Sequence, residues 1–144
     1  MFSVFVKNTL TPLLLRLALA AIFIFHGFAL VGGEGHEWGA AWMNAMAEKQ
    51  GQSPPPAPVQ LAVAWGQLIG GIALAIGFLT RVAALGIIVI MAGAIALVHW
   101  PNGFDITKGG FEYNMLIIAV CIVLVLQGGG NAAVDRFFRL RRRE

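Results

Sequence analysis

The chain has 144 residues, of which 58% are hydrophobic and only 12% are charged. This charged fraction is about half that of an average soluble domain, so the composition argues against a water-soluble globule. The only cysteine is Cys121, which excludes an intrachain disulfide, a CxxC redox pair and a cysteine-ligated zinc or iron–sulfur site. The net charge is +3, but five of the ten basic residues lie in the last nine positions, so they form a tail and not a nucleic-acid-binding patch.

A chain of this length accommodates about four membrane-spanning helices of about 20 residues each. Four apolar stretches are present, at about 10–31, 59–79, 82–98 and 111–127. The first lacks a small-residue cleavage site and is followed by three more, so we interpret it as a retained span and not as a signal peptide. The predicted fold is therefore all-α: one membrane domain over residues 1–144, built as a four-helix transmembrane bundle.

Pro12 near the start of the first stretch and Gly32–Gly33 at its end are typical of a helix start and stop. Arg16 lies close to one end of this span and is expected to extend its guanidinium to the membrane interface. The polar loop 32–58 ends in a rigid proline run. Before that run, residues 39–49 are compatible with a short interfacial helix, on which the following residues share a face: Trp38, Trp42 and Met46.

Thr80–Arg81 is too short for anything but a tight turn, so the second and third spans form a helical hairpin. The strongest helix breakers of the chain follow the third span, at 99–104, and three glycines at 128–130 end the fourth. The tail 131–144 places Phe137, Phe138 and Leu140 among arginines. This pattern predicts a basic amphipathic helix on an anionic lipid leaflet.

The distribution of Lys and Arg predicts the orientation in the membrane. The side with both termini and the 80–81 turn carries Lys7, Arg16, Arg81 and five tail arginines, which is eight, whereas the other side carries Lys49 and Lys108. Both termini are therefore expected in the cytoplasm. The loops 32–58 and 100–110 then lie outside, which is the periplasm if the protein resides in a bacterial inner membrane.

All three histidines and most carboxylates fall in the outer half of this topology. Polar groups at membrane depth are costly and normally face a bundle interior or a cavity, which makes His26, Gln67 and Glu112 candidates for a functional site. We expect His26 to point into the bundle. An imidazole can exchange protons near neutral pH or ligate a metal or haem, but His26 can also be a simple hydrogen-bonding partner of a neighbouring helix.

The other candidates also have structural interpretations. Gln67 can be a hydrogen-bonding contact between helices, and Glu112 can be a carboxylate that interacts with a helix dipole. The small residues that begin at Gly66 and Gly70 indicate close helix packing, with a ligand notch as the alternative. The four tryptophans crowd the outer side as an aromatic belt does.

Several short motifs, in this order, resemble the DoxX family of small four-helix membrane proteins: Leu15-Arg16-Leu17-Ala18-Leu19, Phe25-His26-Gly27, Gly70-Gly71, Gly77-Phe78-Leu79-Thr80-Arg81, His99-Trp100-Pro101-Asn102-Gly103-Phe104 and Gly109-Gly110-Phe111-Glu112-Tyr113. The resemblance implies a four-helix bundle and an association with quinone-linked redox work, since one relative is a subunit of a thiosulfate:quinone oxidoreductase. Many relatives carry a lysine and a glutamate where this chain has Ala29 and Gln67.

Three functions follow from these observations. The first is a redox-linked subunit with an outer quinone site, in which His26, His99 and Glu112 pass protons and the ligand is bound by Gln67, Trp100, Asn102 and Tyr113. The second is a purely structural or assembly subunit of a respiratory, photosynthetic or maturation complex. The third is a haem or metal binder with His26 and His99 as ligands. The expected partners are the lipid bilayer and other membrane or periplasmic subunits, and we assign no metal site and no nucleic acid.

Overall fold

The computed structural model describes residues 2–32, 40–49, 51 and 53–141, and every regular element within them is a helix. The first long helix is continuous over α1 (Phe2–Phe5), η1 (Val6–Leu10) and α2 (Thr11–Gly32). The other long helices are α4 (Ala57–Ile76), α5 (Thr80–Ala94) with its extensions η2 (Ile95–His99) and η3 (Trp100–Asn102), and α6 (Glu112–Gln127). Three short helices complete the fold: α3 (Ala40–Lys49), η4 (Ile106–Lys108) and α7 (Asp135–Arg141).

Three of these helices are long and apolar enough to cross a membrane: Phe2–Val31, Ala57–Ile76 and Thr80–Asn102. The fourth apolar helix, Glu112–Gln127, has 16 residues and packs beside them. The all-α architecture predicted from the sequence is therefore confirmed, and the chain is a membrane protein of three to four apolar helices.

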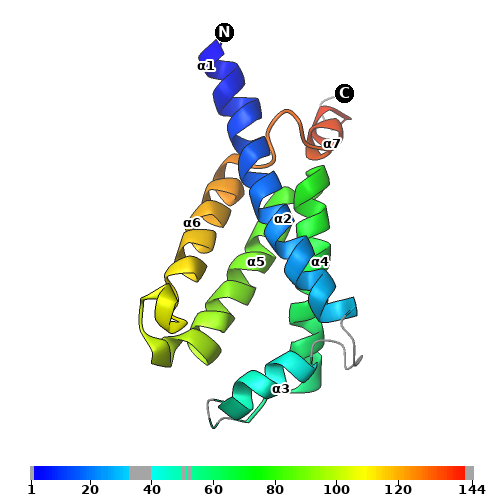
Figure 1. Cartoon of the computed structure of the whole chain (residues 1–144). Coiled ribbons are helices and arrows are strands. Elements are labelled where there is room, and N and C mark those ends of the chain that lie inside the picture. The colour runs from blue at the N-terminus through cyan, green and yellow to red at the C-terminus, as the bar shows by residue number, and fades with distance from the viewer. Residues whose placement is uncertain (1, 33–39, 50, 52, 142–144) are drawn as a thin grey trace.

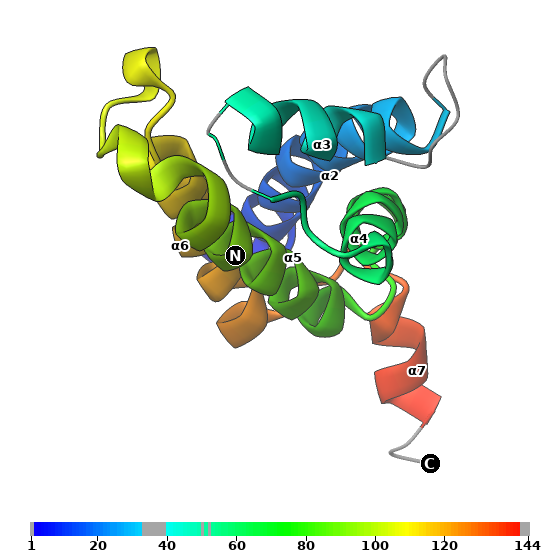
Figure 2. The same ribbon diagram turned by 90° about the horizontal axis from the view of Figure 1, so that it is seen from below.

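Two antiparallel helix pairs form the bundle: α2 packs on α4, and α5 packs on α6 (Figure 1). The turn between α4 and α5 joins the pairs. Both described chain ends lie at one end of the bundle, which we call the termini end. At the opposite end, the loop end, α3 contacts α4 and lies across the bundle near the 99–111 loop (Figure 2).

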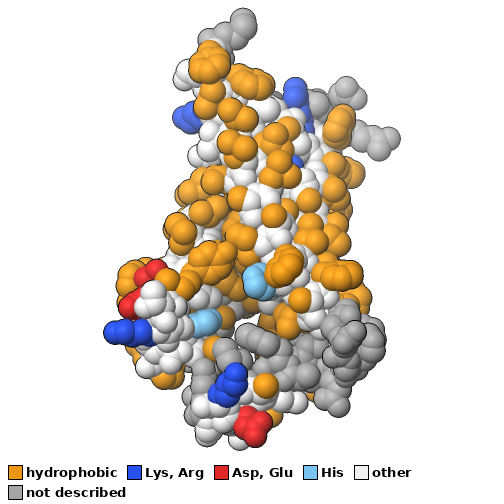
Figure 3. Space-filling view, in the orientation of Figure 1, with side chains coloured by type: hydrophobic (Ala, Val, Ile, Leu, Met, Phe, Trp, Pro, Cys, Tyr) orange, Lys and Arg blue, Asp and Glu red, His pale blue; other side chains and the backbone are white. Residues whose placement is uncertain are grey.

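Glycines allow α2 and α4 to approach closely. A Cβ on Gly27 would overlap the backbone of Leu68, and a Cβ on Gly71 would lie 2.8 Å from the backbone nitrogen of Ile24. The packing interpretation of the small-residue stripe is therefore confirmed at Gly71. Large apolar side chains cover the outside of the bundle (Figure 3), including Phe25, Val89 and Leu126, each more than two thirds exposed. Such a surface is suited to lipid.

The first helix begins earlier than predicted. Pro12 does not start it, because the helix runs through Pro12 to Phe2 by way of the π-helical segment η1. Pro12 has no N–H, so the carbonyl of Asn8, four residues earlier, lacks that helical donor. This carbonyl instead accepts a hydrogen bond of 2.8 Å from the backbone N–H of Asn131. A distant segment thus satisfies the carbonyl and allows the helix to continue.

The expectation that Arg16 reaches the membrane interface is wrong. Its side chain is 1% exposed and donates three hydrogen bonds to backbone carbonyls: Nε to Leu74 at 2.9 Å, Nη2 to Ala75 at 3.1 Å and Nη1 to Gly129 at 2.7 Å. The first two carbonyls belong to the last turn of α4, where a cation is favourable. Arg16 therefore joins α2, α4 and the 128–130 loop.

Two of the three short helices, α3 and α7, lie where short helices were predicted, whereas η4 lies in a segment predicted as a loop. The interfacial helix expected over 39–49 is α3, which is tied to α4 by a 3.1 Å hydrogen bond from Gln60 Nε2 to Asn44 Oδ1. Trp38 and the side chains of Trp42 and Met46 lie outside the described residues. The tail forms α7, on which Phe137 and Phe138 are exposed, and the side chain of Leu140 is not described.

Candidate functional site

His99 is the last residue of η2 and is held in one orientation by the loop that follows. Its Nδ1 lies 2.7 Å from the carbonyl oxygen of Gly109. Because a carbonyl oxygen only accepts hydrogen bonds, the hydrogen must lie on Nδ1. In the neutral ring Nε2 is then the nitrogen that can accept a hydrogen bond.

The loop around His99 is closely hydrogen-bonded. Asn102 Nδ2 also donates to the carbonyl of Gly109, at 3.2 Å, and the backbone N–H of Phe111 donates to the carbonyl of Gly103 at 3.1 Å. The ring of Phe111 stacks on Trp100, with ring centroids 5.6 Å apart and an interplanar angle of 11°. These contacts place an aromatic pair next to the histidine.

Glu112 is partly exposed. Because it is the first residue of α6, its carboxylate lies where the helix dipole favours negative charge. Tyr113 follows it with 38% of its side chain exposed. The loop and the two helix ends beside it thus bring five of the predicted site residues to the loop end: His99, Trp100, Asn102, Glu112 and Tyr113.

His26 does not point into the bundle, and this part of the prediction is wrong. Its side chain is exposed on α2, and its ring meets Phe25 edge to face, with centroids 5.5 Å apart. The inward positions of α2 are taken by Leu19, Phe23 and Gly27, which are spaced four apart, and His26 lies one position away from that row. The two described histidines appear on one face of the molecule, in the half toward the loop end (Figure 3).

Gln67 lies on the buried face of α4, with 9% of its side chain exposed. It is thus inside the bundle, whereas the His99 loop lies at the bundle's end. Ala29 is exposed on α2. Among the described residues, no group of three or more His, Cys, Asp or Glu side chains is arranged to hold a metal ion, and His36 lies outside those residues.

Two buried polar side chains in this half of the molecule are not among the site residues predicted from the sequence. Asn114 is 6% exposed, and its Nδ2 lies 3.5 Å from the sulfur of Met91. Gln60 is 5% exposed, and its Oε1 has no hydrogen-bond partner among the described residues. Asn114 could have been recognised as a polar residue inside an apolar stretch, by the argument that singled out Gln67.

The fold and the loop-end site define a small helical integral membrane protein with a titratable, aromatic-lined end. A sequence profile of the DoxX family matches residues 11–100, which include α2, α4, α5 and His99. The chain therefore belongs to the DoxX family. It is similar to an uncharacterized protein of Haemophilus influenzae (strain ATCC 51907 / DSM 11121 / KW20 / Rd), with 27% identity over 133 residues that cover 88% of this chain and 82% of the relative. No solved structure matches the chain.

Proposed function

We propose that this DoxX-family protein is a subunit of a larger membrane complex and that its loop end carries a site for a quinone-type redox ligand. The supporting observation is the His99 imidazole, whose Nδ1 donates to the Gly109 carbonyl at 2.7 Å, an arrangement that would leave Nε2 to interact with a ligand. Reduction of a quinone consumes protons, so its site needs such a group within reach.

The proposed roles follow from the chemistry of the side chains. His26, His99 and Glu112 are the groups that pass protons. Gln67 can only orient a ligand, because an amide does not titrate. The remaining groups would bind the ligand through an aromatic face and hydrogen bonds: Trp100, Asn102 and Tyr113.

The exposed position of His26 supports the proposal of a partner. His26 lies six residues before the end of α2, which is about 9 Å along the helix, and its neighbours Phe25 and Phe28 are 71% and 68% exposed. An imidazole facing lipid would have no hydrogen-bonding partner there, which is unfavourable. A second subunit or a bound ligand against this face would provide one.

We further propose that the loop end faces the periplasm and that both termini lie in the cytoplasm of a bacterial inner membrane. The support is the eight-to-two distribution of Lys and Arg between the two sides. In this orientation the arginine-rich tail meets the inner leaflet, where anionic lipids attract it.

The test uses the intact complex isolated from the host membrane. His26→Ala, His99→Gln and Glu112→Gln should each abolish quinone-dependent turnover and leave assembly unchanged. The matched control is Glu48→Gln, which removes a carboxylate from the exposed surface of α3 and should leave turnover intact. Normal turnover in all three site variants would contradict the redox proposal.

The second candidate is a structural subunit without a ligand, and α5 provides the observation that favours it. A Cβ built on Gly86 or Gly93 would meet no described atom within 4 Å, so this helix offers two shallow positions to another helix. The absorption spectrum and the lipid extract of the purified protein separate the candidates. A copurified quinone supports the redox site, and a Soret band supports a haem held by His26 and His99. If both signals are absent, the structural role is supported.

A further inference from the structure

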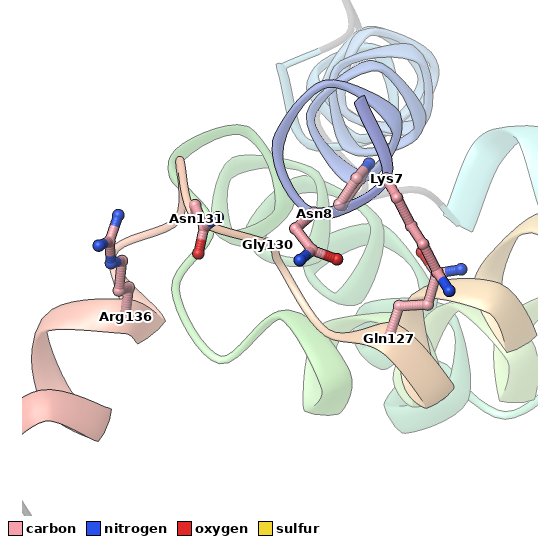
Figure 4. Close-up of a pocket in the computed structure, with 7 residues that line it drawn as sticks. Lys7, Asn8, Gln127, Gly130, Asn131 and Arg136 are labelled. Atoms are coloured by element: carbon pink, nitrogen blue, oxygen red, sulfur yellow. The ribbon is translucent and has the colours of Figure 1, made fainter. Parts of the chain in front are cut away.

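A groove at the termini end carries polar side chains that the proposed function does not use (Figure 4). Its volume is about 340 Å³, and it lies between η1, the end of α6, the 128–131 loop and the start of α7. The described residues that line it include two cations and three amides: Lys7, Arg136, Asn8, Asn131 and Gln127. No carboxylate is among these lining residues, so the groove is positively charged.

The walls of the groove are held by contacts between the two ends of the chain. The backbone N–H of Asn131 donates to the carbonyl of Asn8 at 2.8 Å, and its Nδ2 donates to Thr9 Oγ1 at 3.3 Å. Gly130 has a φ of +76°, and a Cβ there would lie 2.7 Å from Pro12 Cγ. The groove is therefore a defined part of the fold, distinct from the arginines that follow it in the tail.

The carboxylate next to the groove in sequence is already engaged. Asp135 precedes Arg136 and accepts hydrogen bonds from the backbone N–H groups of Leu79 at 2.6 Å and Thr80 at 2.9 Å. Within the part of the chain that the structure describes, neither Lys7 nor Arg136 forms an ion pair. Both cations thus remain available to an anion from outside the protein.

The groove also lies at the level expected for lipid headgroups. Lys7 is 24 residues from Val31 at the far end of the same helix, which corresponds to about 36 Å, whereas the hydrocarbon core of a bilayer is about 30 Å thick. The helices η1 and α6, which supply lining residues, also carry exposed apolar side chains close in sequence to the lining residues, at Leu10 and Leu126. A molecule with an anionic head and apolar chains fits this combination.

We propose that this groove binds the headgroup of an acidic phospholipid. Lys7 reaches toward Gln127 at one end, Arg136 lies at the other, and Asn8 and Asn131 lie between them (Figure 4). Phosphate oxygens would accept charge-assisted hydrogen bonds from the cations, and the amides would bind ester and glycerol oxygens. Basic pockets of this kind on the cytoplasmic side of membrane proteins bind acidic lipid headgroups such as that of cardiolipin.

The experiment measures lipid binding to the full-length protein in neutral detergent, by native mass spectrometry with cardiolipin, phosphatidylglycerol or phosphatidylcholine added. We expect the wild type to bind an acidic lipid at least tenfold more tightly than phosphatidylcholine. Lys7→Gln combined with Arg136→Gln should remove this preference. The charge-matched control, Lys49→Gln with Lys108→Gln at the loop end, should keep it. Equal binding of acidic and neutral lipids by the wild type would overturn the proposal.

Further measurements distinguish lipid binding in the groove from lipid binding by the arginine tail and from binding of free phosphate. The triple variant Arg141→Gln, Arg142→Gln and Arg143→Gln should keep the preference for acidic lipid. If this triple variant loses the preference and the Lys7→Gln, Arg136→Gln variant keeps it, the tail and not the groove binds the lipid. Inorganic phosphate should not compete at millimolar concentration, and full competition would indicate a site for free phosphate. Gln127→Leu removes one exposed amide without a change of charge and should weaken binding several-fold, so the test does not depend on the double variant being folded.

Discussion

Arg16 and Asp135 bond to the two helix ends that flank the α4–α5 turn. Arg16 donates to the carbonyls of Leu74 and Ala75 at the end of α4, and Asp135 accepts from the N–H groups of Leu79 and Thr80 at the start of α5. Each charge has the sign that the nearby helix end favours, and the two charges also attract each other. The turn is held by residues from the first and last parts of the chain.

Arg16 is therefore expected to be a stabilising residue. Arg16→Gln would leave buried carbonyls without their charged donor, and we expect a loss of about 3 kcal/mol in the free energy of unfolding. Arg16→Lys should recover only part of this, because an ammonium cannot reproduce the planar arrangement of donors. Thermal unfolding in detergent measures the effect. Arg81→Gln serves as the control and should cost much less, because its single hydrogen bond, of 3.1 Å to the carbonyl of Leu126, is exposed to its surroundings.

Asp135→Ala removes both acceptors from the start of α5. Since the loss of a helix-capping side chain costs about 1 kcal/mol, the variant should unfold at a lower temperature but remain folded at 25 °C. Glu48→Ala, which removes the same charge from α3, should have no comparable effect. If the two substitutions destabilise equally, net charge and not the cap is responsible.

Gly27 and Gly86 provide a matched test of the packing between helices. Gly27→Ala forces a Cβ into the backbone of Leu68, whereas Gly86→Ala meets open space and removes a flexible residue from a helix. We expect the first variant to lose folded protein and the second to keep or raise its thermal stability. The yield of monodisperse protein in detergent reports both outcomes.

The orientation is testable with reporter fusions. Fusions after Gly51 and after Lys108 should report the periplasm, and a fusion after Arg143 should report the cytoplasm, because basic residues are retained on the cytoplasmic side. A cytoplasmic signal from either loop fusion would place the His99 loop on the wrong side for the proposed site.

The helical class and the approximate position of every long helix could be predicted, because long apolar stretches and glycine breakers are local signals. The ends were less predictable. Residues 77–79 lie outside α4, contrary to the predicted span 59–79, since Gly77 adopts a left-handed conformation with φ of 71°. The start of the first helix was also not predictable, because a proline such as Pro12 normally lies in the first turn of a helix. This helix begins ten residues earlier, at Phe2, and the hydrogen bond from the N–H of Asn131 to the carbonyl of Asn8 explains why it can.

The site was also predictable only where its residues are close in sequence. His99, Trp100, Asn102, Glu112 and Tyr113 are close in sequence, so one loop brings them together. The direction of His26 depends on which row of α2 meets α4, and that row is selected by Gly27 and its close contact with Leu68. The burial of Arg16 likewise depends on carbonyls 58 and 113 residues away.

These separations have a consequence for how the protein is made. The chain emerges from the ribosome N-terminus first, so the helix that carries Arg16 is synthesised long before Gly129 exists. The guanidinium can meet the end of α4 only after that helix has been inserted, and its third acceptor is translated 113 residues after Arg16 itself. Nascent chains that stop before residue 129 therefore lack one acceptor of Arg16, and membrane quality-control proteases should recognise them as unfinished.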